Sequence, residues 1–216
     1  MGIHQYFRSL SDLENIYRCP GKFKYQEHSV AEHSFKVTQV AQFLGNVEEQ
    51  AGQAVNWRAL YEKALNHDYP ELFIGDIKTP VKYATAELRE MLSEVEETMT
   101  RNFINNEIPA EFQAIYHVLL KEGKDDTLEG QILAVADKVD LLYESFGEIQ
   151  KGNPEPTFTK IYSEALETIY QFREMACVQY FLREILPDLL AEKNIEKTDL
   201  PALTDEIKAR VLKSDS

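Results

Sequence analysis

The sequence of 216 residues lacks several features that mark special classes of protein. Its two cysteines, Cys19 and Cys177, make neither a disulfide framework nor a Cys-x-x-Cys motif, which favours a reducing compartment. Nine glycines and eight prolines are few, and no segment of low complexity argues for disorder. No apolar run is long enough to cross a bilayer, and the start of the chain lacks the apolar core of a signal peptide. We therefore expect a soluble cytoplasmic protein.

Positive charge is also scarce in this chain. Twenty-three Lys and Arg residues stand against 37 Asp and Glu residues, so the formal net charge is -14. A nucleic-acid backbone is bound mainly by long basic tracks, and none occurs here. An acidic protein can still bind a small anion where a few cations or a metal ion are concentrated in one cleft. We expect no nucleic-acid polymer as a partner, while a phosphorylated small molecule remains open.

Helical periodicity dominates the chain. Apolar residues recur every three or four positions, most clearly from Leu128 to Phe146. Similar patterns predict helices over residues 87–103, 110–121, 158–185 and 201–212. Clusters of Gly, Pro and Asp separate these segments, but none is long enough for a domain linker. We expect an all-α fold that forms a single domain over residues 1–216.

The stretch YQEHSVAEHSFKV contains two of the five histidines of the chain. Ser29 and Glu32 have the spacing of a capping box, which predicts a helix that starts at Ser29 and leaves His28 outside it. Valines follow His33 at four and seven positions, so His33 points to the apolar side of this helix. By itself, the pattern favours a buried histidine bonded to a carbonyl over a metal ligand.

His67 and Asp68 are adjacent, and we expect them to close a helix that starts near Trp57. An imidazole and a carboxylate directed to one point suit a divalent ion of intermediate hardness. A histidine in the last turn of a helix is also favourable as a cation, so the pair alone is a weak signal.

Asp137 is predicted to be partly buried, because Leu133 and Ala134 precede it by one helical turn and Leu141 follows it. A buried carboxylate without a partner is unfavourable by several kcal/mol. No basic residue lies one helical turn away, and Asp140 adds a second negative charge. The partner is a metal ion or a Lys or Arg from elsewhere in the chain, unless this face is solvated.

The order His33, then His67-Asp68, then Asp137 resembles the pattern of the HD-domain metal-dependent phosphohydrolase superfamily. The resemblance implies that these four side chains hold one divalent ion within a helical bundle. Members with a second metal usually carry two more histidines before the last Asp, whereas this interval contains only His117. We expect a single ion, chosen from Mn, Co, Zn, Fe or Cu with Mg less favoured, and no ligand role for His117.

A narrower resemblance rests on the segment HDYPELFIGDIKTPVKY, together with SVAEHSFKV and IYRCPG. These segments are similar to bacterial HD-domain 5′-deoxynucleotidases. The resemblance implies hydrolysis of nucleoside 5′-monophosphates, with 2′-deoxyribonucleotides preferred, to nucleoside and phosphate. It also implies a metal-site core over residues 18–146 and a homodimer. The helices predicted by periodicity over residues 158–212 are expected as additional C-terminal helices.

The same resemblance assigns roles beyond the metal ligands. Glu71 would orient or deprotonate the attacking water, and Asp76, which follows Gly75, would assist the leaving oxygen. A planar guanidinium suits a phosphate, which is the role implied for Arg18. The implied substrate-binding residues are Arg18, Thr79, Pro80 and Lys82.

One departure from the family concerns the sugar pocket. Where members usually carry a Trp shortly after the arginine, this chain has Cys19 and the segment RCPGKF. Selection of deoxyribose over ribose therefore stays open. Two other functions also stay open: an HD phosphohydrolase acting on nucleoside di- or triphosphates or alarmones, and a non-catalytic helical module that binds a partner. The presence of all four ligand positions favours an enzyme.

Overall fold

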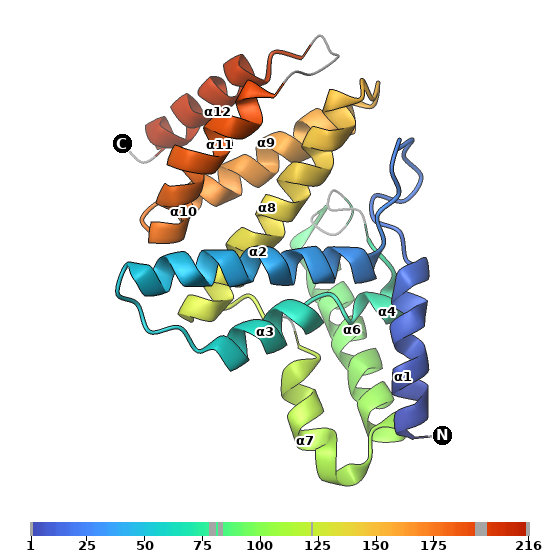
Figure 1. Cartoon of the computed structure of the whole chain (residues 1–216). Helices are drawn as coiled ribbons and strands as arrows, with labels where there is room; N and C mark the ends of the chain where they lie inside the picture. The colour runs from blue at the N-terminus through green and yellow to red at the C-terminus, as the bar shows by residue number, and fades with distance from the viewer. Residues whose placement is uncertain (1, 78–80, 82–83, 122, 193–197, 215–216) are drawn as a thin grey trace. The chain divides into compact units, whose positions relative to one another are not determined.

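A computed structural model describes residues 2–77, 81, 84–121, 123–192 and 198–214 of the chain (Figure 1). Apart from one isolated antiparallel bridge between Tyr17 and Ser29, these residues contain helices, turns and loops, which confirms the all-α prediction. No helix among them has the length and apolar character needed to cross a membrane. The chain divides into two compact units, and the expectation of a single domain stays a prediction.

The first unit comprises Met1–Lys22, Glu27–Phe35 and Glu62–Gly123. It contains helix α1 (Ile3–Asp12), the 3-10 turn η1 (Leu13–Asn15), α4 (Glu71–Ile74), α6 (Ala86–Glu107) and α7 (Ala110–Leu119). Helix α6 packs against both α7 and α1 (Figure 1). The core of the first unit contains the buried side chains Leu13, Val30, Tyr69, Ile104, Ile108 and Leu120.

The second unit comprises Phe23–Gln26, Lys36–Tyr61 and Lys124–Ser216. It contains α8 (Leu128–Gln150), α9 (Pro156–Gln171), α10 (Ala176–Tyr180), the π-helical turn η2 (Phe181–Ile185), α11 (Leu186–Ala191) and α12 (Leu200–Ser214). Helices α2 (Val30–Gln50) and α3 (Trp57–Asn66) contribute to both units. Helix α9 packs against α8 and α12 (Figure 1). The apolar periodicity of α8 corresponds to a buried face that includes Ile132, Val139 and Phe146.

Helix α2 begins where its capping box predicts. The N–H of Ser29 donates to Oε2 of Glu32 at 2.8 Å, and the N–H of Glu32 donates to Oγ of Ser29 at 3.2 Å. These bonds satisfy amide groups that have no partner inside the helix. His28 precedes the helix and His33 lies within it, fully buried like Val37.

The single helix predicted over residues 158–185 is wrong. Helix α9 ends at Gln171, and α10 starts only after Met175 has adopted an extended conformation. The buried carboxylate of Glu48 accepts a hydrogen bond from the N–H of Cys177 at 2.8 Å, which caps the new helix. Burial continues on both sides of the break, so the apolar pattern does not reveal it.

Candidate metal centre

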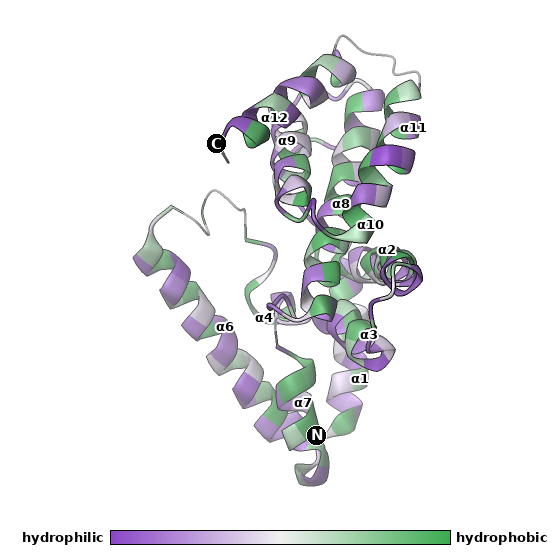
Figure 2. Ribbon diagram, turned by 90° about the vertical axis from the view of Figure 1, so that its left-hand side faces the viewer, coloured by the Kyte–Doolittle hydropathy of each residue, from purple (hydrophilic) through white to green (hydrophobic). Residues whose placement is uncertain are grey.

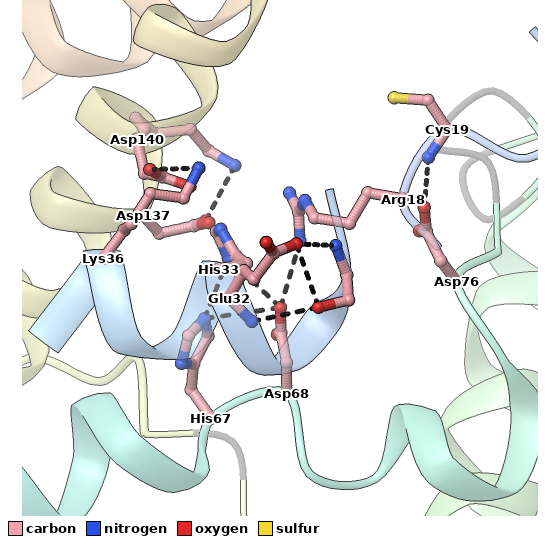
Figure 3. Close-up of polar contacts among 12 residues, drawn as sticks. Arg18, Cys19, Glu32, His33, Lys36, His67, Asp68, Asp76, Asp137 and Asp140 are labelled. Atoms are coloured by element: carbon pink, nitrogen blue, oxygen red, sulfur yellow. Dashed lines mark hydrogen bonds and ion pairs between the residues drawn. The ribbon is translucent and has the colours of Figure 1, made fainter. Parts of the chain in front are cut away.

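Two histidines and an aspartate meet in the first unit, with their side chains directed toward one another (Figure 3). The Nε2 atoms of His33 and His67 are 3.3 Å apart. Oδ2 of Asp68 lies 3.3 Å from Nε2 of His33 and 3.4 Å from Nε2 of His67. Within the part of the chain that the structure describes, these three residues form the group that could hold a metal ion.

His67 and Asp68 lie in the turn that directly follows helix α3. Helix α3 ends at Asn66, so the pair lies in the following turn rather than at the end of the helix as predicted. The N–H of Tyr69 donates to the carbonyl of Asn66 at 3.0 Å, which closes this turn. Adjacent residues in a helix point about 100° apart, whereas a turn lets both side chains face one spot.

A main-chain contact orients the ring of His67. Its Nδ1 atom lies 2.9 Å from the carbonyl oxygen of Ala64. A carbonyl only accepts, so Nδ1 carries the proton and Nε2 presents its lone pair to the cluster. Such support of a histidine ligand through its second nitrogen is common in metal sites. A contact to a main-chain oxygen leaves no signal in residue types, so the sequence does not predict it.

Glu71, the first residue of α4, is a half-buried acid of the site. Burial raises the pKa of Glu71 to about 8, and the carboxylates of Asp68 and Asp76 act in the same direction. Arg18 and His33 oppose this shift in the pKa. Oε2 of Glu71 is buried and has no hydrogen-bond partner among the described residues. A carboxyl group with a pKa near neutrality can accept and release a proton at the pH of the cell.

Asp76 is placed by an unusual backbone conformation. Gly75 before it has φ 72° and ψ 174°, a region that is almost restricted to glycine. Oδ2 of Asp76 accepts a hydrogen bond from the N–H of Cys19 at 2.7 Å (Figure 3). Cys19 itself has φ 52°, in the left-handed region. Asp76 therefore holds the main chain directly after Arg18.

Arg18 lies beside the proposed metal ligands. Its Nη1 atom is 3.3 Å from Oδ2 of Asp68, and the side chain is largely buried. Its main-chain N–H donates to the carbonyl of His28 at 2.9 Å, which ties it to the residue before the cap of α2. A guanidinium in this place can meet an anion that approaches the three-residue cluster.

Asp137 lies on α8, in the second unit. Its Oδ2 atom is 3.0 Å from Nζ of Lys124 and 3.1 Å from Nζ of Lys138. The neighbouring acid Asp140 lies 3.3 Å from Nζ of Lys36. The lysine partner that the sequence left open as an alternative is thus present, and the role of Asp137 as fourth metal ligand stays a prediction.

Three predicted substrate-binding residues, Thr79, Pro80 and Lys82, lie outside the described residues. Their roles stay predictions. His117 is exposed on α7 and is not part of the cluster formed by the two buried histidines and Asp68. That it is not a ligand stays a prediction.

Comparisons with known proteins place the chain in a family. The family model described as 5′-deoxynucleotidase YfbR-like matches residues 5–189. A 5′-deoxynucleotidase of Pectobacterium atrosepticum is 28% identical over 188 residues, which are 87% of this chain and 92% of that protein. The 5′-deoxynucleotidase YfbR of Escherichia coli O1:K1 is 28% identical over 183 residues, 84% of this chain and 90% of that protein.

A solved structure is similar over almost the whole chain. The crystal structure of an HD-domain phosphohydrolase from Listeria innocua is 80% identical and covers 97% of this chain and 100% of its own, with a TM-score of 0.93. These matches confirm the predicted resemblance to HD-domain phosphohydrolases and to 5′-deoxynucleotidases. Because the family model spans most of the sequence, the chain belongs to the YfbR-like 5′-deoxynucleotidase family.

Proposed function

We propose that this protein is a metal-dependent phosphomonoesterase that hydrolyses nucleoside 5′-monophosphates, with 2′-deoxyribonucleoside 5′-monophosphates preferred, to nucleoside and phosphate. One observation carries the proposal. The cluster of His33, His67 and Asp68 has beside it an arginine and a half-buried acid with a raised pKa, in a chain of the YfbR-like 5′-deoxynucleotidase family.

The proposed chemistry follows from the charge of the substrate. A phosphate monoester resists attack because its own negative charge repels nucleophiles. When bound, a divalent ion supplies a Lewis acid that offsets this charge and acidifies a water molecule. Arg18 holds the phosphate, Glu71 accepts the proton of the attacking water, and Asp76 assists the leaving oxygen.

The donor atoms support a transition-metal ion. We propose His33, His67, Asp68 and Asp137 as its ligands, which combine imidazole nitrogens with carboxylate oxygens. This combination suits Mn, Co, Zn, Fe or Cu, whereas Mg favours oxygen ligands alone. Both histidines bind a metal only when they are neutral, so activity is expected to fall at acid pH. Thr79, Pro80 and Lys82 are proposed to complete the substrate site.

Phosphate release from a panel of dNMPs, NMPs, NDPs and NTPs tests this proposal, with Mn, Co, Zn and Mg compared. We expect release from dNMPs that is lost with EDTA and in Asp68→Ala. Asp205→Ala, the same substitution at an exposed position of α12, serves as the control and should retain activity. Absence of release from every monophosphate with every metal would rule out the proposed activity.

The preference for deoxyribose is tested separately, by comparing dAMP with AMP. A ratio of kcat/KM well above one supports the proposed substrate class. Equal values would remove the preference for deoxyribose and leave nucleoside 5′-monophosphates in general as the proposed substrates. This result would be in keeping with Cys19 at the position near which the family usually has a Trp.

We also propose that the protein forms a homodimer through α6 and α7. Both helices expose apolar side chains at helical spacing, and α7 is mostly hydrophobic along its length (Figure 2). These side chains are Met91, Val95 and Met99 on α6 and Phe112, Ile115 and Val118 on α7. Large exposed apolar patches on soluble proteins mark interaction sites.

Light scattering after size-exclusion chromatography tests this assembly. The wild-type protein should have the mass of two chains, and Val95→Glu combined with Ile115→Glu should reduce it to one. A wild-type protein with the mass of one chain at micromolar concentration would contradict the dimer.

A cytoplasmic location is the last part of the proposal. Neither Cys19 nor Cys177 forms a disulfide, in keeping with a reducing compartment. Cell fractionation should recover the protein with cytoplasmic markers, and recovery with a secreted fraction would contradict this location.

A further inference from the structure

Tyr69 directly follows the proposed metal ligands in the turn after α3, and its side chain is only 3% exposed. Its ring packs against Tyr6 of α1 at a centroid distance of 5.7 Å. It also packs against Phe73 at 6.2 Å and against Phe103 of α6 at 6.0 Å. Tyr69 therefore anchors the metal-binding turn in the core of the first unit.

The hydroxyl of Tyr69 forms a hydrogen bond whose direction can be assigned. Oγ of Ser9 lies 2.6 Å from the hydroxyl oxygen of Tyr69 and 2.6 Å from the carbonyl oxygen of Tyr6. The carbonyl can only accept, so the Ser9 hydroxyl donates to it and Tyr69 donates to Ser9. Ser9 is 2% exposed, so water does not compete for this bond. Burial raises the pKa of Tyr69, which keeps its proton available.

The same N-terminal segment also contacts the residue before Tyr69. Arg18, which follows α1 and η1, has its guanidinium 3.3 Å from the carboxylate of Asp68. Two consecutive residues of the turn are thus attached to one segment at two points, Ser9 and Arg18. The contact of Arg18 uses Oδ2 of Asp68, the oxygen atom that faces both histidines, whereas the bond between Ser9 and Tyr69 uses no atom of a proposed ligand. Of these two contacts to the N-terminal segment, the bond between Ser9 and Tyr69 is the one that does not involve a proposed ligand and so does not depend on the ion.

We propose that the hydrogen bond between Ser9 and Tyr69 positions the turn that carries His67 and Asp68, so that α1 sets the affinity of the site for its metal ion. This inference rests on the proposed role of that pair as ligands. Tyr69 and Ser9 are positioning residues, because neither contacts the reacting atoms. A site held in its binding geometry before the ion arrives binds more tightly, since less order is lost on binding.

Binding of Co²⁺ alone to the metal-free protein tests the inference, followed by calorimetry and by the visible absorption of the bound ion. Tyr69→Phe removes the hydroxyl and keeps the ring. We expect its Kd for Co²⁺ to rise about 10- to 100-fold, the usual effect of losing a group that orients metal ligands. Ser9→Ala should raise the Kd similarly, and the double variant should be no worse than the more affected single variant, because both substitutions remove one bond.

Tyr162→Phe is a matched control. The hydroxyl of Tyr162 lies 2.9 Å from Oγ1 of Thr204, and both residues are buried in the second unit. The control loses the same kind of buried tyrosine bond, so its stability should fall by a similar amount. Its Kd for Co²⁺ should stay within about twofold of the wild-type value, since no proposed ligand adjoins Tyr162 in the sequence.

Two results would overturn the inference, and they differ in what they say of the proposed function. If the wild-type protein binds Co²⁺ and His33→Ala does not, but both Tyr69→Phe and Ser9→Ala retain the wild-type Kd, the positioning role fails and the metal site stands. If the wild-type protein binds no Co²⁺, the metal site itself fails. Ser9→Ala provides the measurement on its own should Tyr69→Phe not fold.

Discussion

Among the single residues of the site, Glu71 has a raised pKa, which makes the stability of the protein depend on pH. Its pKa is about 8 in the folded protein without metal, against an ordinary value of 4.5. Between these two values the folded state binds more protons than the unfolded state. Raising the pH therefore favours unfolding, and the stability contributed by protonated Glu71 is lost as the pH rises toward 8. The cause is burial first, followed by the nearby carboxylates of Asp68 and Asp76.

Glu71→Gln, which imitates the protonated carboxyl group, should remove this pH dependence. We expect the metal-free variant to become more stable than the metal-free wild type as the pH rises from 5 toward about 8. Urea unfolding of both proteins across this range, after chelation, measures the difference. A difference that does not change with pH would contradict the raised pKa. The metal-loaded variant should lose about 10²- to 10⁴-fold in kcat, the usual contribution of a general base.

Among the structural elements, the short connection from α4 to Asp76 depends on one glycine. Gly75 has φ 72°, and a Cβ atom there would meet nothing within 4 Å. The cost of Gly75→Ala therefore comes from backbone strain alone, about 1–3 kcal/mol. We expect this loss in denaturant unfolding, together with reduced activity because Asp76 is displaced.

Gly147→Ala is the control for that substitution. Gly147 lies within α8, and a Cβ atom there also meets nothing within 4 Å. In a helix, alanine is favoured over glycine by about 0.5–1 kcal/mol, so this variant should be as stable as the wild type or more stable. Equal effects of the two substitutions would show that the conformation of Gly75 is not strained for alanine.

The start of α2 is the second element that can be tested. Ser29→Ala removes the side-chain acceptor for the N–H of Glu32, and the carbonyl of Ser29 still accepts from the N–H of His33 at 3.0 Å. Loss of such a cap costs about 0.5–2 kcal/mol. Chemical unfolding should show this loss, while Ser93→Ala, at an exposed position of α6, should stay within about 0.5 kcal/mol of the wild type. Equal stability of Ser29→Ala and the wild type would show that the capping box does not stabilise this helix.

For the whole molecule, metal binding should be coupled to stability. An ion that binds only the folded state adds about 2.7 kcal/mol at a concentration 100-fold above its Kd. In a chain of this length each kcal/mol raises Tm by roughly 2–4 °C, so chelation should lower Tm by roughly 5–10 °C. Calorimetry with and without EDTA measures this shift. His33→Ala should abolish the shift, and a shift that persists in this variant would mean that the ion binds elsewhere.

Prediction from the residues alone succeeded where the physical cause is local. The capping box at Ser29, the burial of His33 and the apolar face of α8 depend on residues within a few turns of one helix. Prediction failed where a distant group intervenes. The break after Gln171 is capped by Glu48, which lies 129 residues before Cys177 in the sequence.

The site, too, is only partly predictable from the sequence. The types of its residues and their order along the chain can be read from the sequence, because ligand chemistry belongs to the side chains themselves. The direction in which these side chains point cannot be read from the sequence. His67 presents Nε2 because the Ala64 carbonyl occupies its other nitrogen, and the turn that carries Asp68 leaves the helix at Asn66. The bond between Ser9 and Tyr69 joins residues 60 positions apart. Such contacts form only when the chain has folded, because they depend on hydrogen-bond geometry between segments whose spacing in the sequence carries no periodic signal.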